Sequence, residues 1–124
     1  MGIFSYLRGY QKPSLDEKLF DDWLLKNTGW NSRNAPAEMY YRVSQQAKSK
    51  RKELESKYSI TLTESERITL HVVYFGILTA QRGDLNSAGH LFKTVMKLFE
   101  QADTSNDIRP EILSEIEDLV EDYV

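Results

Sequence analysis

The sequence contains no cysteine among its 124 residues. Disulfide bonds and thiolate metal sites are therefore excluded, and a chain without disulfides suits a reducing compartment. With 40% hydrophobic residues, the chain is long enough to bury a core of its own. We expect packing of that core alone to stabilise one domain.

Long apolar segments are also missing. The N-terminus has no basic region followed by an apolar stretch, so we expect no secretory signal and a cytoplasmic location. The most apolar stretch is interrupted or bounded by Arg67, His71, Thr79 and Arg82. It falls short of the roughly 18 apolar residues that a membrane span needs. We therefore expect no membrane association.

Recognisable catalytic, metal and nucleotide motifs are lacking. The only two histidines, His71 and His90, lie on either side of a predicted turn at Gly83, offset by about 7 to 8 Å along the helix axes. A shared metal site is therefore disfavoured. There is no HExxH pattern and no glycine-rich phosphate loop. The sequence thus predicts no enzyme, no cofactor and no metal.

Hydrophobic residues recur at helical spacing in five segments. The predicted helices cover about 15–28, 36–58, 64–82, 85–101 and 110–123. Residues 59–62 are predicted to form a connector, and residues 1–13 an N-terminal arm. We expect an all-α fold in which residues 14–124 form a single bundle of about five helices.

Local signals mark the ends of these helices. Ser14 and Glu17, and again Thr63 and Glu66, match the capping box that begins a helix. Gly83 separates two helices of similar length, which predicts an antiparallel hairpin. The helix over 64–82 is apolar round most of its circumference, so we expect it to be central.

The hairpin of residues 68–100 combines small and aromatic residues at a regular spacing: Phe75, Gly76, Gly83, Ala88, Phe92 and Val95. At these positions it resembles a single tetratricopeptide repeat, a helical pair that stacks into protein-binding arrays. Val72 and Thr79 stand where the family usually has aromatic residues. The resemblance implies a protein that holds another protein or a peptide. A tight helical hairpin of any other family also favours small residues at its turn and crossing.

Charge is distributed unevenly along the chain. Residues 1–62 carry a net charge of +4 and residues 63–124 a net charge of −7. In the last predicted helix, acidic residues recur at intervals of four, three and four as Glu111, Glu115, Asp118 and Asp122. Glu117 and Glu121 widen this stripe. Like charges at such spacing oppose helix formation. The sequence leaves open whether the stripe serves solubility, pairs internally with the basic second helix, or forms a docking surface for a basic partner.

The basic segment 42–57 suggests a different class of function. Its charges are Arg42, Lys48, Lys50, Arg51, Lys52 and Lys57. Together with Tyr40 and Tyr41 they could contact phosphates and bases. Glu53 and Glu55 dilute the charge, and the chain as a whole is acidic, so the sequence disfavours nucleic acid as a ligand.

These patterns together predict a small protein-binding module: an adaptor, an inhibitor or an immunity-type neutraliser. The predicted binding residues are Glu111, Glu115, Asp118 and Asp122, which would occlude a basic surface of a partner protein. An aromatic anchor would come from Phe4, Tyr6, Tyr10 or Trp30. The alternatives are a nucleic-acid-associated regulator that uses helix 42–57 and a subunit of a larger helical assembly. Formation of a homo-oligomer stays open.

Overall fold

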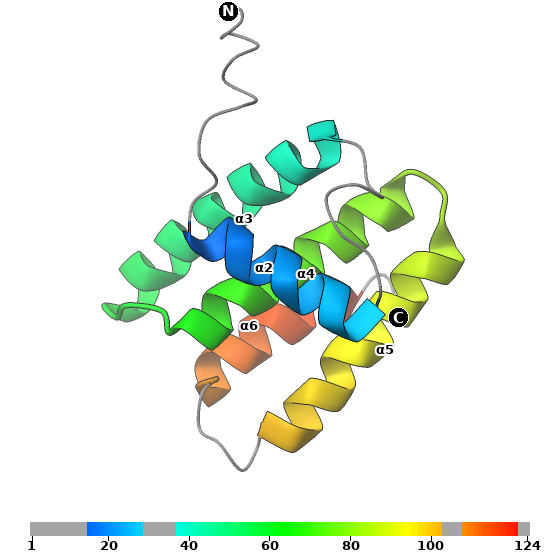
Figure 1. Ribbon diagram of the computed structural model, residues 1–124. Helices are drawn as coiled ribbons and strands as arrows, with labels where there is room; N and C mark the ends of the chain where they lie inside the picture. Colours follow the sequence, from blue (N-terminus) through cyan, green and yellow to red (C-terminus); the bar gives the residue numbers. More distant parts are fainter. Residues whose placement is uncertain (1–14, 29–36, 103–107, 122–124) are drawn as a thin grey trace, which may run out of the picture.

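The computed structural model describes residues 15–28, 37–102 and 108–121 (Figure 1). Within these ranges it contains α-helices and no strand. The helices are α2 (Leu15–Thr28), α3 (Ala37–Tyr58), α4 (Glu64–Gln81), α5 (Leu85–Ala102) and α6 (Pro110–Val120). The prediction of an all-α bundle of five helices is confirmed, and the helix ends differ from the predicted ones by no more than three residues.

Helix α4 lies at the centre of three layers. It runs between α3 and α5, antiparallel to both, while α2 crosses one face of this layer and α6 crosses the other (Figure 1). All four of these helices contact α4. The apolar side chains of α4 are buried round most of its circumference, among them Leu70, Val73, Phe75 and Leu78. The prediction of a central helix is confirmed.

The second capping box has the geometry that its sequence predicts. The Glu66 amide donates to the Thr63 hydroxyl at 3.2 Å, and the Thr63 amide donates back to Glu66 Oε1 at 2.8 Å. At the other end of α4, Gly83 has a φ of 93°. Residues with a side chain rarely adopt this backbone conformation. The Ser87 amide then donates to Asp84 Oδ1 at 3.1 Å and begins α5.

Polar contacts and aromatic packing hold α2 across the bundle. Arg67 Nε donates to both carboxylate oxygens of Asp16 at 3.0 Å, and the Tyr40 hydroxyl donates to Asp21 at 2.9 Å. Burial raises the pKa of Tyr40, and the bond to Asp21 raises it further. Phe20 is buried, with its ring centre 5.9 Å from that of Phe75. The position of α2 is therefore fixed by both α3 and α4.

Several sequence predictions concern residues outside the described ranges. They are the arm of residues 1–13, the capping residue Ser14 and the aromatic residues Phe4, Tyr6, Tyr10 and Trp30.

Helices α4 and α5 approach each other closely at Gly76. A Cβ atom placed on Gly76 would lie 2.6 Å from Cε1 of Phe92, and the Phe92 ring is itself buried. The ring therefore occupies the space that a side chain on Gly76 would need. A Cβ on Gly89 meets no atom within 4 Å, so the same substitution can be compared at a crowded and an open helical position.

We expect Gly76→Ala to leave the protein about 1 to 3 kcal/mol less stable than Gly89→Ala, because the added methyl group overpacks the hairpin. Both substitutions gain about 1 kcal/mol of helix propensity, and this gain cancels in the comparison. The free energy of unfolding in urea measures the difference. Equal stability of the two variants would show that Phe92 moves aside without cost.

Candidate functional site

The position of α6 depends on an ion pair between the buried Glu66 and Arg109, the residue that precedes the helix. Glu66 in α4 is fully buried, and its Oε1 accepts from Arg109 Nη2 at 2.7 Å. Its Oε2 accepts from the Arg109 backbone amide at 2.9 Å and from Arg109 Nε at 3.1 Å. Arg109 Nη2 also donates to the Thr61 carbonyl at 2.6 Å. One carboxylate thus joins the start of α4 to the residue that precedes α6.

Glu66 stays ionised despite its burial. Burial alone would raise the pKa of its carboxyl group, but the hydrogen bonds from Arg109 and from the Thr63 amide outweigh that effect and lower the pKa. The pKa of Arg109 is raised by the same contact. Arg109 binds the ionised form of Glu66. The pair therefore stabilises the fold at pH values above the ordinary carboxyl pKa, and this stabilisation is lost as the pH falls through the lowered pKa of Glu66.

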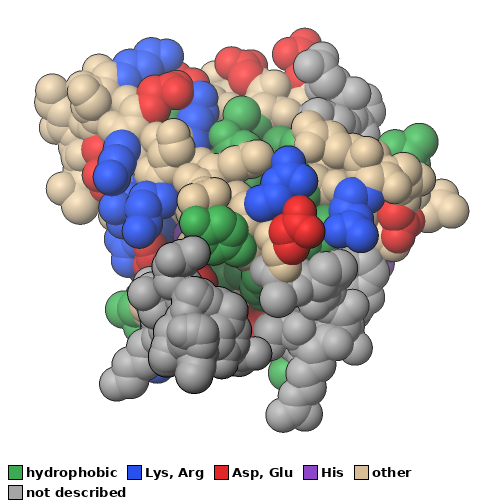
Figure 2. Space-filling model, turned by 90° about the horizontal axis from the view of Figure 1, so that it is seen from above, with side chains coloured by type: hydrophobic (Ala, Val, Ile, Leu, Met, Phe, Trp, Pro, Cys, Tyr) green, Lys and Arg blue, Asp and Glu red, His purple; other side chains and the backbone are tan. Residues whose placement is uncertain are grey.

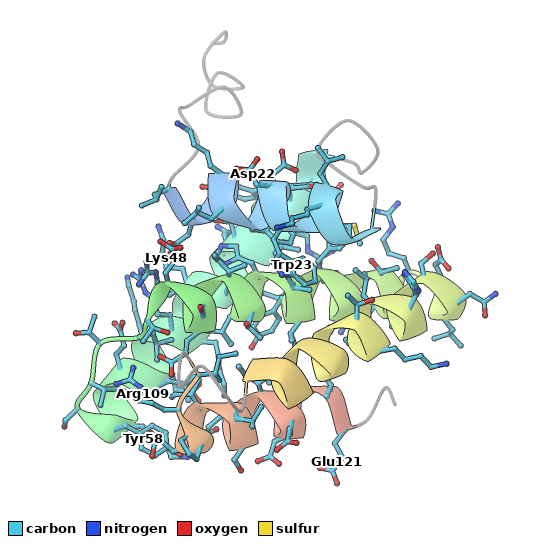
Figure 3. All side chains as sticks on the ribbon, turned by 60° about the horizontal axis from the view of Figure 1, so that its bottom comes forward. Asp22, Trp23, Lys48, Tyr58, Arg109 and Glu121 are labelled. Atoms are coloured by element: carbon cyan, nitrogen blue, oxygen red, sulfur yellow. The ribbon has the colours of Figure 1, made fainter. Side chains whose placement is uncertain are left out.

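Helix α6 has one apolar face and one acidic face. Pro110 occupies its first turn, where a missing N–H costs no hydrogen bond. Ile112, Ile116 and Val120 are buried against the bundle. The carboxylates that lie on the opposite face are Glu111, Glu117, Asp118 and Glu121, all of them exposed. Figure 3 shows Glu121 at the end of α6, directed away from the other helices. We call these four residues the acidic face.

Glu115 lies at the edge of this face and contacts α3. Its Oε2 accepts from Lys57 Nζ at 2.5 Å and from the Tyr58 hydroxyl at 2.6 Å, and Tyr58 lies beside the start of α6 in Figure 3. The bonds from Lys57 and then from Tyr58 lower the pKa of Glu115. They also raise the pKa of Lys57 and of Tyr58. Glu115 therefore helps to attach α6 to α3.

The structure thus divides the predicted binding residues. Glu111 and Asp118 lie on the acidic face, Glu115 is paired within the protein, and Asp122 lies outside the described ranges. Glu117 and Glu121, which the sequence analysis treated as secondary, belong to the exposed set. A helical projection of the sequence predicts that Glu115 lies at the edge of the apolar face. At about 100° per residue, Glu115 lies only about 40° from Leu119, which is partly buried against the core.

Ion pairs are absent from the acidic face. Within the described ranges, no Lys or Arg forms an ion pair with any of its four carboxylates, although the charge of Glu111 contributes to the raised pKa of Arg109. Glu117 and Glu121 are four residues apart, a spacing at which like charges destabilise a helix by a few tenths of a kcal/mol. The last turn of α6 has no basic residue, so Glu121 also opposes the helix dipole. These carboxylates weaken the helix that carries them.

Several basic residues of α3, unlike the carboxylates of the acidic face, have oppositely charged neighbours within the protein. Lys50 pairs with Glu53, Arg51 lies 3.9 Å from Asp16, and Lys57 pairs with Glu115. The other basic residues of segment 42–57 are exposed: Arg42, Lys48 and Lys52. In Figure 2 most of the Lys and Arg side chains lie at the left of the molecule, with Asp and Glu among them, and others lie to the right of its centre. Three of the six predicted basic residues therefore have a carboxylate neighbour within the protein, and only Lys57 makes a close contact with another helix.

The histidines show no shared role. His71 is buried, and its Nδ1 donates to the Arg67 carbonyl at 2.9 Å, whereas His90 is exposed. Burial lowers the pKa of His71 and favours its neutral form. In the part of the chain that the structure describes, no group of three or more potential ligands could hold a metal ion. No helix in that part is long and apolar enough to span a membrane.

We expect Arg109→Met to destabilise the protein by about 3 kcal/mol at pH 7, because it leaves the Glu66 carboxylate buried without its cation. The pH dependence should also reverse. As the pH falls from the ordinary carboxyl pKa to the lowered pKa of Glu66, the wild-type protein loses the stability that the pair provides, whereas the variant gains stability because protonation removes an unpaired buried charge. Urea unfolding at pH 7 and at about pH 3.5 measures both effects.

Arg82→Met is the matched control, since Arg82 is exposed and has no ion pair among the described residues. An Arg109→Met protein that behaved like this control at both pH values would contradict the role assigned to the pair.

No protein-family model, curated protein or solved structure shows significant similarity to this chain.

Proposed function

We propose that the chain is a small cytoplasmic protein-binding module that occludes a basic surface of another protein through the acidic face of α6. The observation that carries this proposal is the set of four exposed carboxylates, which have no ion-pair partner among the described residues. Complementary charge speeds the encounter of two proteins and selects between partners. An adaptor, an inhibitor and an immunity-type neutraliser all use such a surface.

The energetic cost of the acidic face supports this proposal. Its carboxylates repel one another along α6, and those near the last turn oppose the helix dipole. A bound cationic surface would relieve both effects, because it supplies the charge that the end of the helix lacks. The buried residues Ile112, Ile116 and Val120, together with the Glu66–Arg109 pair, hold the helix in place while its acidic face points outward. The surface is therefore pre-organised for a partner.

The helical hairpin gives weaker support. The close approach at Gly76 and Phe92 agrees with the packing that a tetratricopeptide-like hairpin needs. Repeats of that family bind peptides or proteins, which is the class of function proposed here. Other tight helical pairs pack in the same way, so the acidic face remains the main argument.

The other functions suggested by the sequence find less support. A nucleic-acid contact would use the charges of segment 42–57, but Lys50, Arg51 and Lys57 have carboxylate partners or neighbours within the protein. A subunit of a larger assembly was suggested by the apolar circumference of α4. That surface is covered by α2, α3, α5 and α6 of the same chain.

The proposal is tested by neutralising two charges on α6. We expect Glu117→Gln with Glu121→Gln to reduce recovery of the partner at least about fivefold, since two rim charges contribute on the order of 1 kcal/mol or more. The measurement is affinity capture from a nuclease-treated native lysate at near-physiological salt, with quantitative mass spectrometry. The free energy of unfolding should be unchanged or slightly higher, because repulsion within α6 is relieved.

The matched control is Asp22→Asn with Glu38→Gln, which removes two exposed charges from other helices and changes the net charge equally. Its partner recovery should equal that of the wild-type protein. Equal recovery in all three proteins, or an equal loss in both variants, would reject the acidic face as the binding surface.

A further inference from the structure

One carboxylate of α6 already holds an ammonium group. Lys57 Nζ lies 2.5 Å from Glu115 Oε2 and 5.3 Å from the centre of the Tyr58 ring, over its face. The Tyr58 hydroxyl donates to the same carboxylate oxygen at 2.6 Å. A carboxylate beside an aromatic face is a favourable place for a cation, because the ring adds a cation–π attraction. We call Glu115 and Tyr58 the ammonium site, which Lys57 occupies.

The ammonium site borders the acidic face. Glu111 comes four residues before Glu115 and Asp118 three residues after it, so both are its neighbours on the surface of α6. The charge of Lys50 contributes to the lowered pKa of Glu115, but the Lys50 ammonium group is bonded to Glu53 at 2.7 Å. Lys57 is therefore the cation that separates Glu115 from the exposed carboxylates on either side of it.

Lys57 can leave the ammonium site while α6 keeps its place. Its side chain is 56% exposed, and ion pairs at such exposed positions contribute little to stability. Once released, the ammonium group would be hydrated by solvent. The hydroxyl of Tyr58 would stay bonded to Glu115, and Ile112 and Ile116 hold the apolar side of α6 in the core. The site would therefore keep its form when Lys57 moves out.

We infer that a lysine side chain of the partner protein replaces Lys57 at the ammonium site, so that Lys57 is an internal competitor of the partner. This inference rests on the proposed function, because it takes the acidic face as the docking surface. It extends that surface from Glu121 at the end of α6 to Tyr58 beside its start, both labelled at the lower edge of Figure 3. Lysine is the matching residue, because the site already holds a compact ammonium group.

Titration with hexalysine, acetylated and amidated at its ends, tests the inference at an ionic strength of about 50 mM, where charge attraction is weakly screened. We expect Lys57→Gln to bind the peptide at least about threefold more tightly than Lys52→Gln, because only the first variant loses the internal competitor. Lys52 is an exposed residue of the same helix. Both substitutions lower the net charge by one, so the general attraction of the peptide cancels. NMR titration of the backbone amides measures both affinities.

The same comparison in a Glu115→Gln background isolates the site. There, Lys57→Gln and Lys52→Gln should bind hexalysine equally, because the carboxylate for which the two ammonium groups compete is gone. The Tyr58 hydroxyl can still donate to the amide oxygen at that position, and the amide spectrum of each variant reports whether it is folded.

Equal affinities of Lys57→Gln and Lys52→Gln with Glu115 present would overturn the inference. An advantage of Lys57→Gln that persists without Glu115 would overturn it as well, and so would an absence of peptide binding in every protein. The Glu117→Gln, Glu121→Gln variant keeps this outcome separate from the proposed function. If that variant binds hexalysine or captures the partner less well while Lys57→Gln gives no advantage, the acidic face stands and the ammonium site alone is rejected.

Discussion

Two adjacent residues at the start of α4 hold the three layers of the protein together. Glu66 binds Arg109 on the side of α6, and Arg67 binds Asp16 on the side of α2. The Glu66 carboxylate is fully buried, so it must keep its cation, because an unpaired charge at that place would cost several kcal/mol. This pair, together with the burial of Ile112, Ile116 and Val120, sets the direction of α6 and with it the direction of the acidic face.

Much of the fold follows from local signals that the sequence contains. Helix ends depend on short-range chemistry, such as the reciprocal bonds of Thr63 and Glu66 and the positive φ of Gly83. Those signals predict the helices within a few residues. The layer order could not be derived in the same way. It depends on contacts such as Tyr40 with Asp21 and Glu66 with Arg109, which join residues 19 and 43 positions apart, and local patterns do not encode such partners.

The candidate site was predictable only in part, for the same reason. Two residues of the predicted acidic stripe, Glu111 and Asp118, are exposed in the structure. Glu115, by contrast, contacts Lys57 and Tyr58 of α3. Its angular position near Leu119 indicates an edge residue. Its partner could only come from the fold, because it lies 57 to 58 positions away in the sequence. Of the possibilities left open by the sequence, internal pairing with the basic helix therefore describes Glu115, whereas Glu111 and Asp118 are exposed.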